Sequence, residues 1–166
     1  MVPLGKYAIG YKIVCASKKT KKKYSATVTD PAWMVEYRPF KKVVPKQPFT
    51  PLFCHGRLRD AIATMLDWMI FGNDEGKEMY WELWICLMEK PKKVYVVSDM
   101  IDNETLSEFW YGNSNNEEIR WEIDHLHFYG AESICLLMKL GSENSLWLKM
   151  LVPLKKLYNK LRWRLR

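Results

Sequence analysis

The ten residues YAIGYKIVCA, from Tyr7 to Ala16, are the stretch that decides the fold expected for this chain. Larger apolar residues occupy the odd positions from Tyr7 to Cys15, and smaller or polar residues such as Gly10 and Lys12 occupy the even positions. Alternation with a period of two is typical of a β-strand with one buried face. The chain is therefore expected to open with a strand that has one buried face.

A cluster of lysines separates this strand from the next β-prone run at 24–29, so we predict a hairpin with a basic loop. Further along, Pro39, Pro45, Pro48 and Pro51 break up two short strands and a connector. The predicted strands cover 35–38, 41–44, 52–54, 78–88, 94–97, 119–128 and 133–140, with Tyr129-Gly130 as the turn between the last two.

One helix is predicted with particular clarity. Apolar residues spaced three and four apart, from Leu58 to Met69, form one face of a helix that should end near Gly72. A short helix is expected within 98–110, and 112–116 is expected to be a loop. The fold class expected is α+β: a single domain over 1–166, with an antiparallel or mixed sheet packed by the central helix and a basic amphipathic helix appended over 152–166.

Composition narrows the protein class. The chain has 166 residues, of which 48% are hydrophobic and 14% aromatic, so it should bury a sizeable core. No apolar run reaches the roughly 20 residues needed to span a bilayer, and the first residues lack the layout of a secretory signal. We therefore expect a cytoplasmic protein, with the four cysteines present as reduced, buried thiols.

Charge is distributed very unevenly along the chain, although its net value is only +7. Residues 1–59 carry 13 Lys and Arg against 2 Asp and Glu, residues 60–146 carry 6 against 17, and residues 147–166 carry 7 against none. Basic ends around an acidic middle indicate a dipolar surface that could steer a polyanion to one side. Alternatively, the ends fold over the acidic middle and neutralise it.

The order of several short phrases resembles short uncharacterised proteins that are frequent in bacteriophage genomes. The resemblance covers about residues 8–97, and it consists of GYKIV at 10–14, YSA at 24–26, VEY at 35–37, VVP at 43–45, LFC at 52–54 and ELWIC at 82–86. It implies a viral origin, a compact α+β fold and the cytoplasm of the host cell as the location. It supplies no catalytic residues.

Signatures of enzymatic chemistry are weak. Asp124, His125 and His127 are the best metal candidates, with His55 or Cys54 as a further ligand, but no signature spacing supports them. Neither a nucleophile elbow nor a phosphate-binding loop occurs. Acid pairs at 78/82 and 118/122 could serve an ADP-ribosyltransferase-like reaction, although no matching Arg or His is evident. We expect no metal and no cofactor.

The C-terminal stretch LKKLYNKLRWRLR, 154–166, is the most informative segment for function. If Pro153 lies in the first turn, a helix can run to the end of the chain. At about 100° per residue, Leu154, Leu157, Tyr158, Leu161 and Leu165 form one stripe, and Trp163 lies opposite it between two basic rows. We expect the stripe to dock on the protein body and the cations and Trp163 to face outward, toward polyanion backbones and unpaired bases.

These observations together predict a non-enzymatic binding protein that uses a basic surface to engage nucleic acid or a host nucleoprotein complex. It would inhibit a bacterial defence system, as anti-CRISPR proteins do. The expected binding residues are Lys18, Lys19, Lys21, Lys22, Lys23, Lys156, Lys160, Arg162, Trp163 and Arg164.

Three alternatives stay open at this point. The first is an inhibitor that contacts only protein, through the acidic middle. The second is a transferase that uses Glu82 and Glu122. The third is attachment to a membrane surface through Leu157 and Leu161.

Overall fold

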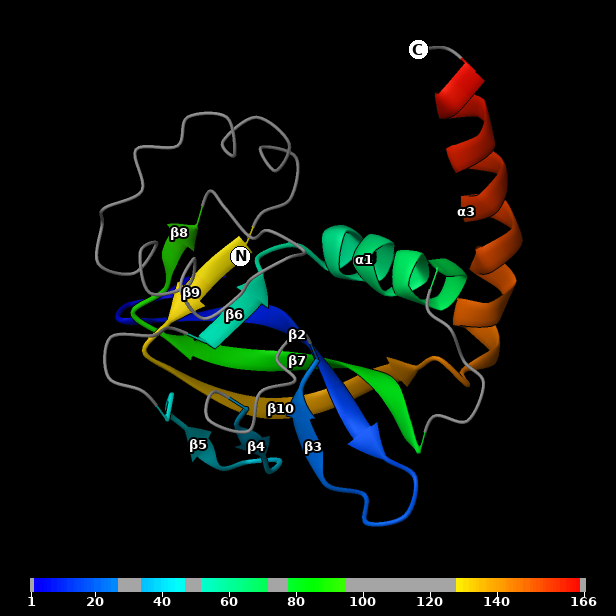
Figure 1. Cartoon of the computed structure of the whole chain (residues 1–166). Coiled ribbons are helices and arrows are strands. Elements are labelled where there is room, and N and C mark those ends of the chain that lie inside the picture. The colour runs from blue at the N-terminus through cyan, green and yellow to red at the C-terminus, as the bar shows by residue number, and fades with distance from the viewer. Residues whose placement is uncertain (1, 27–33, 47–51, 72–77, 95–127, 165–166) are drawn as a thin grey trace.

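The computed structural model of the chain describes residues 2–26, 34–46, 52–71, 78–94 and 128–164 (Figure 1). The predictions for 27–33, 47–51 and 95–127, including the short helix within 98–110, lie outside these residues. The helices are α1, Leu58–Phe71, and α3, Leu146–Arg164. The strands are β1, Val2–Leu4; β2, Tyr7–Ser17; β3, Lys23–Ser25; β4, Glu36–Tyr37; β5, Lys42–Val43; β6, Leu52–His55; β7, Met79–Glu89; β8, Lys92–Val94; β9, Phe128–Ala131; and β10, Ser133–Ser142.

The predicted α+β class is confirmed: the described strands form one antiparallel sheet with the order β5-β10-β7-β2-β6-β9-β8. β2 and β7 are its centre, and they pair over their full length, from Tyr7 opposite Glu89 to Ser17 opposite Met79. The other edge of β2 is shared in turn by β1, β6 and β3, and β4 extends β3. One long strand therefore organises most of the molecule.

Both faces of β2 are covered, which corrects the expectation of one buried side. The odd-numbered Ile13 packs with Leu83 of β7 against Ala61 and Met65 of α1. The even-numbered face is buried more deeply, and Val14 lies in a second cluster with residues of β4, β6, β7, β9 and β10. Small even-numbered residues allow these strands to approach closely, so the face that looks less hydrophobic in the sequence is the more enclosed one.

Two local predictions about the C-terminal third were wrong. Tyr129 and Gly130 are not a turn but part of β9, because Gly130 is in register with both Phe53 of β6 and Lys92 of β8. The final helix does not begin at residue 152, as expected: it begins at Leu146, and Pro153 lies inside it. The extra six residues at its start, 146–151, contribute to how the helix is turned on the body.

The rotation of α3 is fixed where the helix leaves β10. A Cβ atom added at Gly141 would lie 2.8 Å from the Trp147 ring, so the indole lies directly against this glycine. Leu148 is fully buried beside α1, with Leu151 and Val152 partly buried next to it. These contacts direct one side of α3 toward α1 and leave the rest of its circumference outside.

Candidate nucleic-acid interface

The lysine cluster lies on the ordered hairpin between β2 and β3. The Ser17 backbone closes the turn: its N–H donates to the Lys22 carbonyl at 2.9 Å, and its carbonyl accepts from the Lys21 N–H at 3.0 Å. Lys21 has a positive φ of 59°, which turns the chain tightly. The predicted basic hairpin is confirmed, and it presents the exposed side chains of Lys18, Lys19, Lys21 and Lys22.

A buried carboxylate anchors the base of this hairpin. Glu82 is 3% exposed, and it bonds to Lys139 of β10 and lies 4.0 Å from the Lys23 ammonium of β3. The Trp84 indole donates to its carboxylate at 2.9 Å and the Tyr80 hydroxyl at 3.1 Å. Burial alone raises the pKa of Glu82, but the hydrogen bonds from Lys139 and Trp84 and the nearby ammonium charges outweigh it, and the pKa lies below its ordinary value. Glu82 therefore holds two cations at fixed positions.

A second carboxylate joins the hairpin to the next strand. Pairing of β3 with β4 places Glu36 opposite Tyr24. The Glu36 carboxylate accepts from the Arg38 guanidinium at 3.0 Å and lies 3.6 Å from the Lys22 ammonium. The hydrogen bond from Arg38 lowers the pKa of Glu36, with a further contribution from Lys22. Cations 16 positions apart in the sequence are thus brought to one site.

The turn that follows presents an exposed aromatic ring. Phe40 is 74% exposed and has a φ of +61°, a left-handed backbone that is costly for a bulky residue. Its N–H donates to the Leu136 carbonyl of β10 at 2.8 Å, and the Lys41 N–H donates to the Arg38 carbonyl at 3.1 Å. The surrounding structure therefore holds a phenyl ring in solvent between Arg38 and Lys41.

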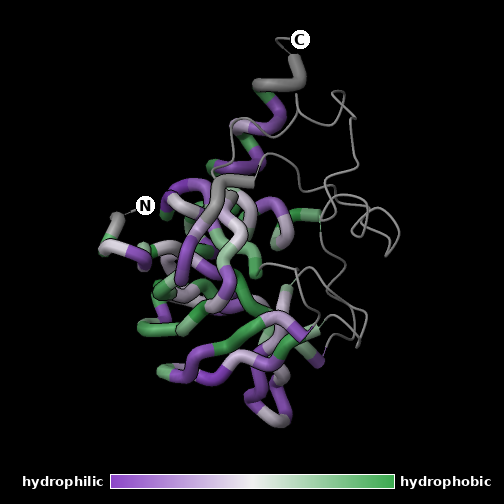
Figure 2. Tube along the Cα trace, turned by 90° about the vertical axis from the view of Figure 1, so that its left-hand side faces the viewer, coloured by the Kyte–Doolittle hydropathy of each residue, from purple (hydrophilic) through white to green (hydrophobic). Residues whose placement is uncertain are grey.

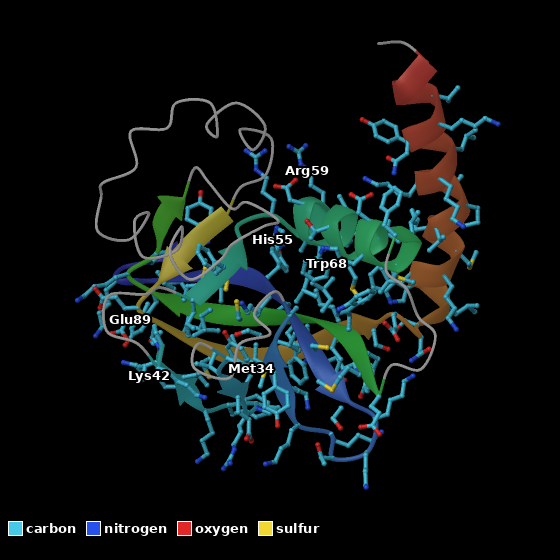
Figure 3. The ribbon with its side chains drawn as sticks, in the orientation of Figure 1. Met34, Lys42, His55, Arg59, Trp68 and Glu89 are labelled. Atoms are coloured by element: carbon cyan, nitrogen blue, oxygen red, sulfur yellow. The ribbon has the colours of Figure 1, made fainter. Side chains whose placement is uncertain are left out.

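We call this region the basic face. Its cations come from the hairpin, from the Arg38–Lys41 turn and from β10, and two cations, Lys21 and Lys139, also lie over the Tyr80 ring at 5.8 and 5.7 Å. Figure 3 shows the many side chains that end in nitrogen on this side of the molecule, below the sheet. The members of the basic face are Lys18, Lys19, Lys21, Lys22, Lys23, Arg38, Phe40, Lys41 and Lys139.

The expected orientation of the C-terminal helix is wrong. Leu154, Leu157, Tyr158 and Leu161 are between 49% and 63% exposed, so the leucine stripe faces solvent rather than the protein body. The side facing α1 is instead the one that contains Lys155, whose ammonium lies 3.1 Å from the Asp67 carboxylate. On the same side, the amide of Asn159 donates to Asp67 at 3.4 Å, and the apolar contacts of Leu148 complete the docking side.

The described lysines of α3 do not join the basic face. Lys156 and Lys160 are exposed, whereas the side chains of Arg162, Trp163 and Arg164 lie outside the described part of the chain. In Figure 1, α3 rises along one side toward the C-terminus, and the β2–β3 hairpin lies at the opposite end of the molecule. Figure 2 shows mainly hydrophilic residues at that lower end and an alternation of hydrophilic and hydrophobic residues along α3. The hairpin lysines and the described lysines of α3 therefore lie on separate surfaces.

The interior side of β2 contains a buried cation and two thiols. The Lys12 ammonium donates to the Phe53 carbonyl at 2.6 Å and lies 5.4 Å from the centre of the Tyr37 ring. The Cys54 and Cys86 sulfur atoms are 3.4 Å apart, and both side chains are thiols that are not joined in a disulfide. Burial raises the pKa of the Cys86 thiol well above its usual range, which disfavours a reactive thiolate.

The enzymatic and metal alternatives gain nothing from this geometry. Asp124, His125, His127 and Glu122 lie outside the described residues, and burial lowers the pKa of His55 to about 3. Within the described ranges, no group of three His, Cys, Asp or Glu residues is arranged to hold a metal ion. The Glu82 carboxylate, which a transferase would need in an open cleft, is enclosed by its partners.

The buried carboxylate of Glu89 makes the stability of the fold depend on pH. Hydrogen bonds from Lys42, Ser133 and Lys6 lower the pKa of Glu89 to about 2, against about 4.5 for an ordinary glutamate. A lowered folded-state pKa stabilises the fold above pH 4.5, and this contribution is lost as the pH falls toward 2.

We expect Glu89→Gln to flatten the decline of the urea denaturation midpoint between pH 4.5 and 2. Glu132→Gln, which removes an exposed ion pair with Lys90, should leave the decline unchanged. Identical pH profiles for Glu89→Gln and the wild type would contradict this assignment.

Sequence reasoning missed four members of the basic face: Arg38, Phe40, Lys41 and Lys139. The run Arg-Pro-Phe-Lys at 38–41 contained a usable signal, because proline is favoured at the second position of a turn and an aromatic between two cations is unusual there. Lys139 carried no such signal, since only the pairing of β10 with β7 brings it to Glu82.

Comparisons with protein-family models, with curated proteins and with solved structures found no match to this chain. Neither of the described helices combines the length and apolar composition that a bilayer-spanning segment needs.

Proposed function

We propose that this protein binds single-stranded nucleic acid through the basic face. The observation that carries the proposal is Phe40, an exposed ring held at a left-handed φ by two backbone hydrogen bonds and flanked by Arg38 and Lys41. Backbone strain that the surrounding structure maintains is a frequent mark of a functional position. Cations that follow a sugar-phosphate backbone, combined with an aromatic on which a base can stack, are the two elements of single-strand binding.

The ion-pair networks support this proposal because they position the cations in advance. Glu36 joins Lys22 to Arg38, and Glu82 holds Lys23 and Lys139, so the hairpin and the turn form one surface without bound nucleic acid. Lys21 and Lys41 project into solvent beside them. Phosphates that contact such cations release counterions, and affinity should therefore fall steeply with salt.

The charge requirement can be tested with a triple variant. Lys21→Gln/Lys22→Gln/Lys41→Gln should weaken binding of a 20-nucleotide oligothymidylate at least tenfold near 0.1 M salt. If each lysine contacts one phosphate, the slope of log affinity against log salt should fall by about 2, at roughly 0.7 per contact on a single strand. Fluorescence anisotropy over a salt series measures both quantities.

The matched control removes the same charge elsewhere. Lys149→Gln/Lys156→Gln/Lys160→Gln changes three exposed lysines of α3, on a different surface, and should leave oligothymidylate affinity within twofold of the wild type. Equal losses in the two triple variants would show that only net charge matters, and would contradict a defined site on the basic face.

If a base stacks on Phe40, removal of the ring should weaken binding without lowering the stability of the fold. Phe40→Gly should weaken oligothymidylate binding about tenfold, because stacking of one base contributes about 1–3 kcal/mol. The free energy of unfolding should stay the same or rise by up to about 1 kcal/mol, since glycine adopts a positive φ without strain. Fluorescence anisotropy measures the affinity, and urea denaturation measures the free energy of unfolding. The control Val44→Ala, at another exposed apolar residue, should change neither, and loss of stability in Phe40→Gly would contradict the strain argument.

We extend the proposal to a nucleoprotein complex of a bacterial host, which is the target expected from the resemblance to bacteriophage proteins. Affinity purification from a bacterial lysate, with and without nuclease, separates the possibilities. Recovery of partners that collapses with nuclease supports direct binding of nucleic acid. Recovery of one protein that resists nuclease and survives the Phe40→Gly change supports the protein-only inhibitor instead.

A further inference from the structure

The outward side of α3 carries an apolar row that no described part of the protein covers. Its members are four, four, three and four positions apart, so they lie along one side of the helix over about 22 Å at 1.5 Å per residue. Each is between 49% and 75% exposed. We call this row the outer stripe, and its members are Leu146, Met150, Leu154, Leu157 and Leu161.

The outer stripe is exposed because another side of the same helix makes the internal contacts. Leu148, Leu151 and Val152 pack toward α1, and Lys155 and Asn159 bond to Asp67. These bonds hold α3 at a fixed rotation, so the stripe cannot turn inward without breaking them. A contiguous apolar row on a protein surface marks a site of interaction.

Charge indicates what kind of surface this row contacts. Lys149, Lys156 and Lys160 are exposed along one border of the stripe, at about 280–320° when Leu146 is set to zero. Trp147 and Tyr158 lie along the other border at about 100–120°. Residues 147–166 contain seven Lys and Arg and no Asp or Glu. The surface that the outer stripe contacts should therefore present both apolar groups and negative charge.

We propose that the outer stripe binds the surface of an anionic lipid membrane, with α3 lying in the interface between headgroups and acyl chains. Leucines on one side, aromatics at the border and lysines beside them form the pattern of an interfacial helix. A second copy of the chain fits less well, because an antiparallel α3–α3 contact would bring the two rows of lysines together. A protein partner would meet one convex ridge, which offers little of the area that a stable interface buries.

The described elements leave this side of α3 open to a flat surface. In Figure 1, α3 is the outermost element on its side of the molecule, and its C-terminal part extends beyond α1. The basic face lies at the other end, so membrane contact and nucleic-acid contact use different residues. The membrane proposal does not depend on the proposed function, and each can fail separately.

Co-sedimentation with lipid vesicles tests the proposal. We expect the wild-type chain to bind vesicles of 30% phosphatidylglycerol in phosphatidylcholine and to bind pure phosphatidylcholine at least tenfold more weakly. Leu154→Gln/Leu157→Gln should reduce binding to the anionic vesicles at least tenfold. Leu4→Gln/Val44→Gln, which changes two equally exposed apolar residues away from α3, should not reduce it. Unchanged oligothymidylate affinity and circular dichroism establish that each variant is folded.

The same two triple lysine variants test whether vesicle binding requires the charge of α3. Lys149→Gln/Lys156→Gln/Lys160→Gln should weaken vesicle binding at least fivefold, and Lys21→Gln/Lys22→Gln/Lys41→Gln should have little effect. The proposal would be overturned if vesicle binding disappeared in Lys21→Gln/Lys22→Gln/Lys41→Gln and survived in Leu154→Gln/Leu157→Gln. The basic face would then be the surface that binds the vesicles. A sedimentation equilibrium that shows a dimer, lost on Leu154→Gln/Leu157→Gln, without vesicle binding would also overturn it and assign the stripe to a second copy.

Discussion

Glu82→Ala should lower the free energy of unfolding by about 3 kcal/mol, because it removes a buried counter-charge and leaves a buried hydrogen-bond donor without its acceptor. The carboxylate is 3% exposed, and it receives bonds from Lys139, Trp84 and Tyr80. Without it, the Trp84 N–H loses its acceptor in the interior, and Lys23 keeps its charge in a confined position. Urea denaturation at pH 7 measures the change.

Glu36→Ala is the matched control for Glu82→Ala. Glu36 also joins two cations of the basic face, but its side chain is half-buried and its partners Lys22 and Arg38 are exposed. Exposed pairs contribute about 0–1 kcal/mol, so the control should stay within 1 kcal/mol of the wild type. Equal losses of stability at the two positions would mean that burial of the carboxylate does not determine the cost of its removal.

Leu83→Ala should lower the free energy of unfolding by about 3–4 kcal/mol. Leu83 is adjacent to Glu82 but points to the other face of β7, where it is fully buried with Ile13 and the residues of α1. Truncation of such a leucine removes its transfer free energy and leaves a cavity, and the combined cost is typically about 2–5 kcal/mol. Urea or thermal denaturation monitored by circular dichroism measures it.

Leu157→Ala serves as the control for Leu83→Ala and tests the orientation of α3 directly. Because Leu157 is 55% exposed, its truncation should change the free energy of unfolding by no more than about 0.5 kcal/mol. If the leucine stripe docked on the body, as the sequence predicts, the cost would approach that of Leu83→Ala. A large loss of stability at Leu157 would therefore contradict both the orientation of α3 and the membrane proposal.

The basic face and the outer stripe differ in how far the sequence predicted them. The lysines at 18–23 were predicted as a hairpin loop from local alternation and charge, and the structure confirms the hairpin. Their association with Arg38 and Lys139 required the pairing of β3 with β4 and of β10 with β7. Strand pairing is decided by contacts between distant segments, which no local pattern records.

The sequence by itself determined the α+β class, the central helix, the long strands β2 and β7, and the existence of an amphipathic C-terminal helix. These features depend on periodicity within one segment, and a segment contains that information. The tertiary structure alone decided which side of α3 faces inward. A helical wheel gives the angles between side chains but no direction toward the body. Leu148 and Leu151, which help to fix this direction, precede residue 152, where the helix was expected to begin.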